Sequence, residues 1–231
     1  MASKKIKVAL IGNPNVGKSS LFNLLTGLHQ KIANFPGVTV EKKLGNATIF
    51  NSATGQPNHL EIVDLPGTYS LYPTSPDERI PFEVLCDPQN EDHPDVVIIV
   101  ADGTNLKRSL FLASQVIDLK IPSLLALNMM DLVQSQGIKI NPAELERRIG
   151  IRVCPVVARK ESGIEELKQA LINELPVPTI DIYDTNSIKP SLLNAIKAEL
   201  QLKSNYAALQ IANHINSLEH FNLAEEQLRK L

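Results

Sequence analysis

The stretch KVALIGNPNVGKSSLFNLLTG, residues 7–27, joins an apolar run, a loop with two glycines and an amphipathic run. The phosphate-loop pattern G-x-x-x-x-G-K-[ST] is formed by Gly12, Gly17, Lys18 and Ser19. In this pattern the glycines let backbone N–H groups surround a polyphosphate, the lysine reaches the outer phosphates, and the hydroxyl holds Mg²⁺. The plainer alternative is a glycine-rich turn with a surface lysine, but a strand before the loop and a helix after it favour the phosphate loop.

The helix that is expected to begin at Lys18 adds its positive N-terminal end to the same loop. We therefore expect nucleotide phosphates to contact the whole loop, namely Gly12, Asn13, Asn15, Val16, Gly17, Lys18, Ser19 and Ser20. The loop predicts a nucleoside triphosphate site, and it does not separate ATP from GTP.

The composition is that of a normal globular protein, with 43% apolar residues among 231 and a formal net charge of −2. The net charge of −2 does not provide the positive field of a nucleic-acid-binding protein, and the 4% of aromatic residues does not provide its stacking surface. We therefore expect no nucleic-acid partner. No apolar run reaches the ~18 residues of a membrane-spanning helix. The sequence as given predicts a soluble cytoplasmic chain in which Cys86 and Cys154 are buried free thiols.

Short β-branched apolar runs alternate with segments of helical period along most of the chain. Strands are predicted at 6–11, 96–100, 123–127 and 153–157, and helices at 18–26, 105–119, 142–149 and 164–175. The runs 39–50 and 59–63 are predicted to form a hairpin that adds an antiparallel edge. Because buried parallel strands read as continuous apolar runs, the expected fold is α/β, a doubly wound and mostly parallel six-stranded sheet.

The alternation stops at ELPVPTIDIYDTNSIKP, residues 174–190, where proline and asparagine accumulate. Beyond this stretch, apolar residues recur at helical spacing over 191–202, 207–218 and 223–231. We expect a nucleotide-binding domain over 1–175 and a small all-α helical domain over 176–231. The sequence stops inside the last amphipathic pattern, which suggests a chain truncated from a longer protein.

In a doubly wound sheet, ligands bind beyond the carboxyl ends of the strands. DLPG follows the strand 59–63, so Asp64 is expected to hold Mg²⁺ through a water, and Gly67 to offer its N–H to the terminal phosphate. Thr39 is expected to complete the Mg²⁺ shell and to contact the terminal phosphate, so that its loop is ordered only while that phosphate is present. The plainer alternatives are an ordinary turn at Gly67 and a β-branched residue entering a strand at Thr39.

NMMD follows the strand 123–127 and predicts which base is bound. Asp131 is able to accept hydrogen bonds from both the N1–H and the exocyclic amine of guanine, while Asn128 braces the loop and the base edge. Adenine lacks these paired donors, and a buried carboxylate left unpaired would reject it. N-x-x-D alone is also compatible with an Asx turn. In order after the phosphate loop and DLPG, it predicts GTP and GDP as the ligands.

These motifs resemble those of translation-factor-type (TRAFAC) GTPases. GNPNVGKSSLFN, NFPGVTVE, DLPGTYSL and NMMD, followed by a helical region, resemble in particular the N-terminal cytosolic region of bacterial ferrous iron transport protein B (FeoB). The resemblance covers residues 4–175 and implies a P-loop GTPase G domain and a helical domain joined to a membrane-spanning iron permease that this chain lacks.

The same resemblance implies a GTPase switch that regulates or drives ferrous iron uptake at the cytoplasmic face of the bacterial inner membrane. It makes small cytosolic Feo proteins candidate partners and a homo-oligomer a candidate assembly. Two other functions stay open. A soluble Era-like GTPase of the ribosome or tRNA shares the phosphate-loop asparagine, although it usually brings a basic RNA-binding domain. A GTP sensor without turnover is compatible with Thr68.

The resemblance also bears on hydrolysis. Many small GTPases carry a glutamine after D-x-x-G to orient the attacking water, whereas this chain has the shorter Thr68, which implies slow intrinsic hydrolysis. FeoB-like GTPases are activated by K⁺ on a phosphate-loop asparagine, which Asn15 matches, with a plain turn residue as the alternative. The expected catalytic residues are Asn15, Lys18, Thr39 and Gly67. The expected metal ligands are Ser19, Thr39 and Asp64 for Mg²⁺ and Asn15 for K⁺.

Two motifs depart from the family pattern. Met129 stands where the base motif usually has a lysine, and its apolar stem is able to pack against the purine. In VVARK, Ala158 would present its N–H to the guanine oxygen and Arg159 would lie over the base, while Val157 replaces a supporting hydroxyl. Weaker base binding and faster nucleotide exchange are therefore expected. The five histidines share no metal-ligand spacing with the cysteines, so no iron site is expected in this segment.

Overall fold

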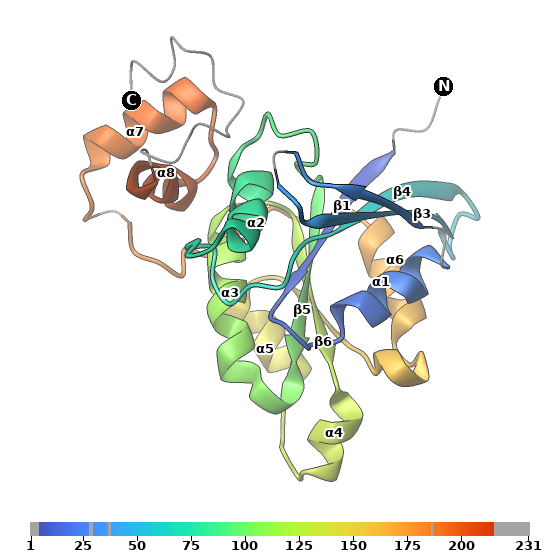
Figure 1. Cartoon of the computed structure of the whole chain (residues 1–231). Helices are drawn as coiled ribbons and strands as arrows, with labels where there is room; N and C mark the ends of the chain where they lie inside the picture. Colours follow the sequence, from blue (N-terminus) through green and yellow to red (C-terminus); the bar gives the residue numbers. More distant parts are fainter. Residues whose placement is uncertain (1–4, 28–29, 37, 186, 215–231) are drawn as a thin grey trace.

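The computed structural model describes residues 5–27, 30–36, 38–185 and 187–214. A seven-stranded sheet with the order β2-β3-β4-β1-β5-β6-β7 forms the centre of the molecule (Figure 1). Its strands are β1 (Ile6–Gly12), β2 (Gln30–Asn34), β3 (Glu41–Phe50), β4 (Pro57–Asp64), β5 (Val96–Asp102), β6 (Ser123–Asn128) and β7 (Arg152–Pro155). The pairs from β4 through β1, β5 and β6 to β7 are parallel, and β2, β3 and β4 pair antiparallel.

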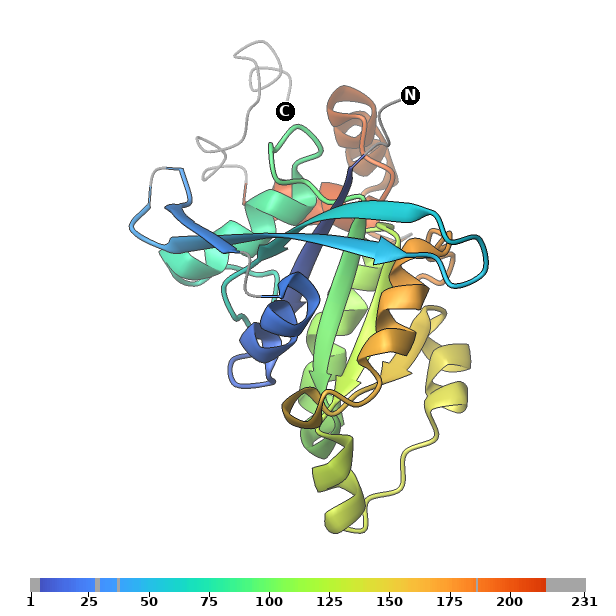
Figure 2. The same ribbon diagram turned by 90° about the vertical axis from the view of Figure 1, so that its right-hand side faces the viewer.

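Helices cover both faces of this sheet. They are α1 (Lys18–Thr26), α2 (Pro76–Cys86), α3 (Leu106–Asp118), α4 (Met130–Ser135), α5 (Pro142–Ile149), α6 (Ile164–Ile172), α7 (Pro190–Leu200) and α8 (Asn205–Asn213). Because successive side chains of a strand point to opposite faces, β1 divides the core in two. Val8 and Leu10 belong to the cluster that includes α1 and α6, which face the viewer in Figure 2. Ala9 and Ile11 belong to the cluster with α2 and α3.

The predicted parallel strands, the hairpin and the helices α1, α3, α5 and α6 are confirmed to within a few residues. The strand count was wrong, since the sheet has seven strands and not six. The additional strand is β2, an edge strand in which no residue is buried, so it carries no alternation of apolar and polar side chains. The helix α2 was also not predicted, because Pro76 and Pro81 read as turn residues, although Pro76 occupies the first turn and Ser75 caps it.

The C-terminal helices α7 and α8 pack against each other, and α8 packs against α2 and α3 (Figure 1). Their buried residues, among them Leu193, Ile196 and Ile211, join the same cluster as Ala9 and Ile11. The helix predicted over 191–202 is confirmed as α7, and that over 207–218 corresponds to α8, which ends at Asn213. The helix predicted over 223–231 lies outside the described residues. A domain boundary at 175/176 stays a prediction.

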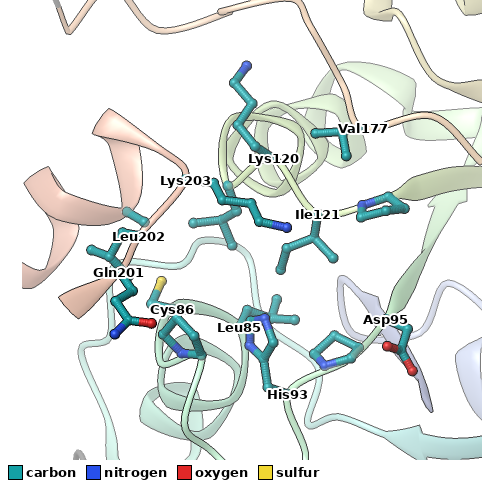
Figure 3. A pocket seen from close by; sticks show the side chains of 15 residues that line it. Leu85, Cys86, His93, Asp95, Lys120, Ile121, Val177, Gln201, Leu202 and Lys203 are labelled. Atoms are coloured by element: carbon teal, nitrogen blue, oxygen red, sulfur yellow. The ribbon is translucent and has the colours of Figure 1, made fainter. Parts of the chain in front are cut away.

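The contact between the C-terminal helices and the rest of the chain leaves a cavity of about 350 Å³ (Figure 3). Lys120 and Ile121 line it from the turn between α3 and β6, Leu202 from the turn between α7 and α8, and Cys86 from the end of α2. Cys86 and Cys154 are both buried and free, as predicted. No helix among the described residues has the length and apolar character needed to span a bilayer.

Candidate nucleotide site

The phosphate loop connects the C-terminal end of β1 to the start of α1, where two residues have left-handed backbone conformations. Asn15 has φ 66° and Gly17 has φ 87°. A Cβ atom on Gly17 would lie 2.3 Å from Nδ2 of Asn128, so only glycine satisfies both the conformation and the space at this position. The loop is therefore packed directly against the end of β6, which carries Asn128.

A cavity of about 580 Å³ lies over this loop. It is lined by Asn13, Pro14, Asn15, Gly17, Lys18, Ser19, Ser20 and Gly67. No side chain among the described residues caps the first turn of α1, so its N–H groups and its positive end are open to an anion. Asn13 is buried, and neither Oδ1 nor Nδ2 of its amide has a hydrogen-bond partner in the described part of the chain. A polar ligand in this cavity would remove that deficit.

Lys18 and Ser19, which line the cavity, form a polar cluster with Asp64. The Asp64 carboxylate at the end of β4 accepts a hydrogen bond from Nζ of Lys18, and Oγ of Ser19 lies 3.4 Å from its second oxygen. The Asp64 side chain is 4% exposed, so this ion pair is largely removed from water. A hydroxyl and a carboxylate are the hard oxygen ligands that Mg²⁺ prefers, and the residues present therefore fit this ion.

Gly67 and Thr68 follow Asp64 and approach the phosphate loop. A Cβ atom on Gly67 would lie 3.2 Å from the nitrogen of Pro14, and the N–H of Thr68 donates to the carbonyl of Gly12 over 3.2 Å. The Thr68 side chain is fully buried, and its hydroxyl donates to the carbonyl of Ser70 over 2.7 Å. This hydroxyl is thus already used within its own loop, so Thr68 is not free to orient a water molecule.

Thr39 lies in the loop before β3 and is exposed. The loop is anchored by Phe35, which is buried and whose N–H donates to the carbonyl of Val40 over 3.0 Å. Within the described residues, Thr39 is not among those that line the phosphate cavity. The structure thus brings Ser19 and Asp64 together, but not Thr39 with them.

Asn128 joins the phosphate loop to the base motifs. Its Nδ2 donates to the carbonyl of Val16 over 2.9 Å, and its Oδ1 accepts from the N–H of Ala158 over 3.0 Å. This side chain is buried, so both hydrogen bonds are shielded from water. One amide therefore fixes the relative position of three segments that are far apart in the sequence.

Asp131 lies in the first turn of α4, close to Asn128 in sequence. Its carboxylate accepts from Nε of Arg159 over 2.8 Å and lies 3.4 Å from Nζ of Lys160. Partial burial raises the pKa of Asp131, but the hydrogen bonds from Arg159 and from the N–H of Leu132 outweigh it, and the net pKa is lowered. The carboxylate therefore stays ionised at neutral pH, as an acceptor of two hydrogen bonds must.

Arg159, which was predicted to lie over the base, pairs with Asp131 in this structure, and its contact with the base stays a prediction. Val157 exchanges main-chain hydrogen bonds with Ser162, which closes the loop that presents Ala158. Met129 has φ 63° and precedes α4. Sequence reasoning missed Lys160, although it stands beside Arg159 in VVARK as a second cation within reach of Asp131.

Comparison with known proteins agrees with this geometry. The family described as "Ferrous iron transport protein B" matches residues 6–171, more than half of the chain. The Fe(2+) transporter FeoB of Leptospira biflexa is 37% identical over 218 residues, which are 94% of this chain and 30% of that protein. The chain thus spans less than a third of the length of this curated relative.

Two solved structures of the cytosolic domain of the T. maritima FeoB iron transporter are similar over nearly the whole chain. The GDP form I is 33% identical and has a TM-score of 0.75, with 99% of this chain and 91% of that chain covered. The GMPPNP form is 33% identical and has a TM-score of 0.74, with 96% and 90% covered. Fold and sequence agree over the same region as the phosphate loop and the base motifs, and the chain therefore belongs to the ferrous iron transport protein B family, whose G domain has a GTPase fold.

Proposed function

We propose that this chain is a GTP-binding and GTP-hydrolysing switch domain that regulates or drives ferrous iron uptake through an attached membrane permease. The observation that carries the proposal is the double hydrogen bond of Asn128 to Val16 and Ala158, with Asp131 three residues further on. It supports a single cleft in which one guanine nucleotide reaches from the base motifs to the phosphate loop. The relatives of known structure with GDP and GMPPNP support the same ligand.

The chain's own residues would divide the work on the triphosphate. The N–H groups of the phosphate loop and of Gly67 would bind the phosphate oxygens, and Lys18 would leave Asp64 to contact the outer phosphates. Ser19 and Thr39 would hold Mg²⁺ directly and Asp64 through a water, which requires the Thr39 loop to close over the cavity. When bound, Mg²⁺ neutralises charge on the phosphate oxygens.

Hydrolysis would be slow without a further cation. The inward hydrogen bond of Thr68 leaves the position of the usual water-orienting glutamine without a side chain directed to the cavity. Asn15 lines the cavity, is exposed and has φ 66°, so its side-chain oxygen is available to a monovalent cation. When bound there, K⁺ supplies positive charge beside the β- and γ-phosphates.

Asn15→Ala is expected to abolish the stimulation of GTP hydrolysis by K⁺ and to leave nucleotide affinity within about twofold. The cause is the loss of one ligand oxygen without loss of the loop's N–H groups. The measurement is phosphate release in KCl and in NaCl, beside fluorescence titration with labelled GDP. Asn46→Ala removes an exposed asparagine on β3 and serves as the control. Equal K⁺ stimulation in Asn15→Ala and in the unmodified chain would refute the ion-ligand role.

Thr39→Ala is expected to leave GDP affinity unchanged and to lower the turnover of GTP at least about tenfold, since only the closed loop would bring the Thr39 hydroxyl to Mg²⁺. GDP titration and single-turnover hydrolysis measure the two quantities on the same preparation. Normal turnover in this variant would mean that another residue completes the Mg²⁺ shell.

The whole protein is proposed to lie at the cytoplasmic face of the bacterial inner membrane, with small cytosolic Feo proteins and further copies of itself as candidate partners. The pairing of Arg159 with Asp131 supports fast nucleotide exchange, because this arginine competes for the carboxylate as GDP leaves. A nucleotide-chase experiment with Arg159→Ala measures that competition directly.

A further inference from the structure

The loop after Asp64 is fastened to α3 by one buried side chain. Oε1 of Gln115 accepts from the N–H of Leu71 over 2.6 Å and from Oγ of Ser70 over 3.2 Å, and its Nε2 lies 3.1 Å from the same hydroxyl. Gln115 is 6% exposed, so these hydrogen bonds are made away from water. Ser70 in turn accepts from the hydroxyl of Thr68, the neighbour of Gly67.

The end of the same helix is fastened to the segment that leads to the C-terminal helices. Oδ1 of Asp118 accepts from the N–H of Ile182 over 2.8 Å, and Oδ2 accepts from the N–H of Tyr183 over 2.7 Å. The main-chain carbonyl of Asp118 accepts from the hydroxyl of Ser204, which also caps α8. Nearby, Nζ of Lys120 pairs with Asp181 over 2.8 Å.

A carboxylate at the C-terminal end of a helix is repelled by the negative end of the helix dipole. Asp118 is also 2% exposed, so its charge is taken out of water. The main-chain N–H groups of Ile182 and Tyr183 offset these costs while this segment stays in place, and Nζ of Lys120, 3.7 Å from Oδ1 of Asp118, offsets a further part of them. The attachment is therefore specific to one position of the segment on α3.

Gln115 and Asp118 stand three residues apart on α3, and side chains at this spacing lie on the same face about one turn apart. Both residues belong to α3, which is continuous over 13 residues and therefore moves as a unit. Lys120 also lines the cavity of Figure 3, which is bordered by the turn between α7 and α8. The junction is not close-packed on this side, which leaves room for that turn to shift.

We propose that Gln115 and Asp118 are positioning residues through which α3 links the loop of Gly67 to the segment 180–183 and to α8. A contact of the terminal phosphate with Gly67 displaces the loop, Gln115 carries the displacement to α3, and Asp118 carries it to Ile182 and Tyr183. The inference rests on the proposed function, because Gly67 must respond to the terminal phosphate. It requires nucleotide binding but not turnover.

Hydrogen exchange at the amides of Ile182 and Tyr183, with GDP or GMPPNP bound, tests the proposal. In the unmodified chain the two nucleotides are expected to give exchange rates that differ at least about fivefold. Gln115→Met keeps a side chain of similar length but removes all three hydrogen bonds, so the difference in exchange rate between the two nucleotides should disappear. Gln115→Glu keeps the acceptor for Leu71 and should restore part of it. Ser114→Ala, which loses only a hydrogen bond within α3, is the matched control and should retain it.

Linkage is reciprocal, so Asp118→Asn, which keeps only one of the two acceptor oxygens, should also change the ratio of GMPPNP to GDP affinity by about fivefold. Combining it with Gln115→Met should add nothing further to that change if both act through one path. Nucleotide-dependent exchange that persists in Gln115→Met, or none in the unmodified chain with both nucleotides bound, would overturn the proposal. Failure of the unmodified chain to bind either nucleotide would instead contradict the proposed function, and titration detects this separately.

Discussion

Asp131→Asn is expected to lower the affinity for GTP by about 100- to 1,000-fold and to raise the affinity for XTP. The two hydrogen bonds from guanine to the carboxylate are charge-assisted, and losing one while placing an amide donor against the exocyclic amine costs about 3–4 kcal/mol. Xanthine carries a carbonyl where guanine carries the amine, so the new amide donor would suit it. Titration of the unmodified chain and of Asp131→Asn with GTP and with XTP measures this change of base preference.

Two further variants separate base recognition from charge. Arg159→Ala removes the nearer of the two cations beside Asp131, leaves Lys160 and removes no acceptor, so GTP affinity should be equal or higher. Glu174→Gln removes one negative charge, as Asp131→Asn does, at an exposed position away from the nucleotide cleft. It should change neither GTP nor XTP affinity. Because the pKa of Asp131 is lowered, its carboxylate stays ionised, and Asp131 should add no pH dependence to GTP affinity between about pH 6 and 8, where only the terminal phosphate titrates. Unchanged GTP affinity in Asp131→Asn would count against this residue as the base ligand.

Gly17→Ala is expected to abolish measurable nucleotide binding, a loss of at least about 100-fold. The new methyl group would meet Nδ2 of Asn128 at 2.3 Å, so the hydrogen bonds of Asn128 to Val16 and Ala158 would be lost or displaced. The free energy of unfolding should also fall by about 2 kcal/mol or more, from the left-handed backbone and the lost hydrogen bonds together.

Gly55→Ala is the matched control, since Gly55 has φ 68° and a Cβ atom there would meet nothing within 4 Å. It carries the same backbone strain and should cost about 1 kcal/mol of stability with nucleotide affinity unchanged. Chemical denaturation and GDP titration of both variants measure the two effects. Similar binding in Gly17→Ala and Gly55→Ala would show that the contact with Asn128 does not shape the loop.

The parts of the fold that the sequence predicts are those in which local pattern and burial agree. The strands β1, β5 and β6 are buried on both faces and read as apolar runs. The helix α1 is predicted by the phosphate-loop motif that precedes it. The strand β2 escapes prediction because it is exposed and its main chain pairs with β3 at the edge of the sheet. Pairing between distant segments leaves no periodic trace in a short polar strand.

The candidate site shows the same division. Residue types at the ends of strands identify Gly17, Lys18, Asp64 and Asn128 as neighbours, because parallel strands end at one edge of a sheet. The direction of a side chain is set by its partners, which the sequence does not specify. Thr68 turns inward to Ser70, and Arg159 turns to Asp131, and in both cases a long-range or loop hydrogen bond outweighs the local pattern.

The amide of Asn128 has a consequence for how the nucleotide cleft becomes ordered. The side chain of Asn128 is shared by the two ends of the cleft. A ligand fragment that orders one end therefore lowers the entropic cost of ordering the other end when a second fragment binds there. Base and polyphosphate should then bind together more tightly than their separate affinities imply. A cleft of this kind favours the complete nucleotide over its pieces.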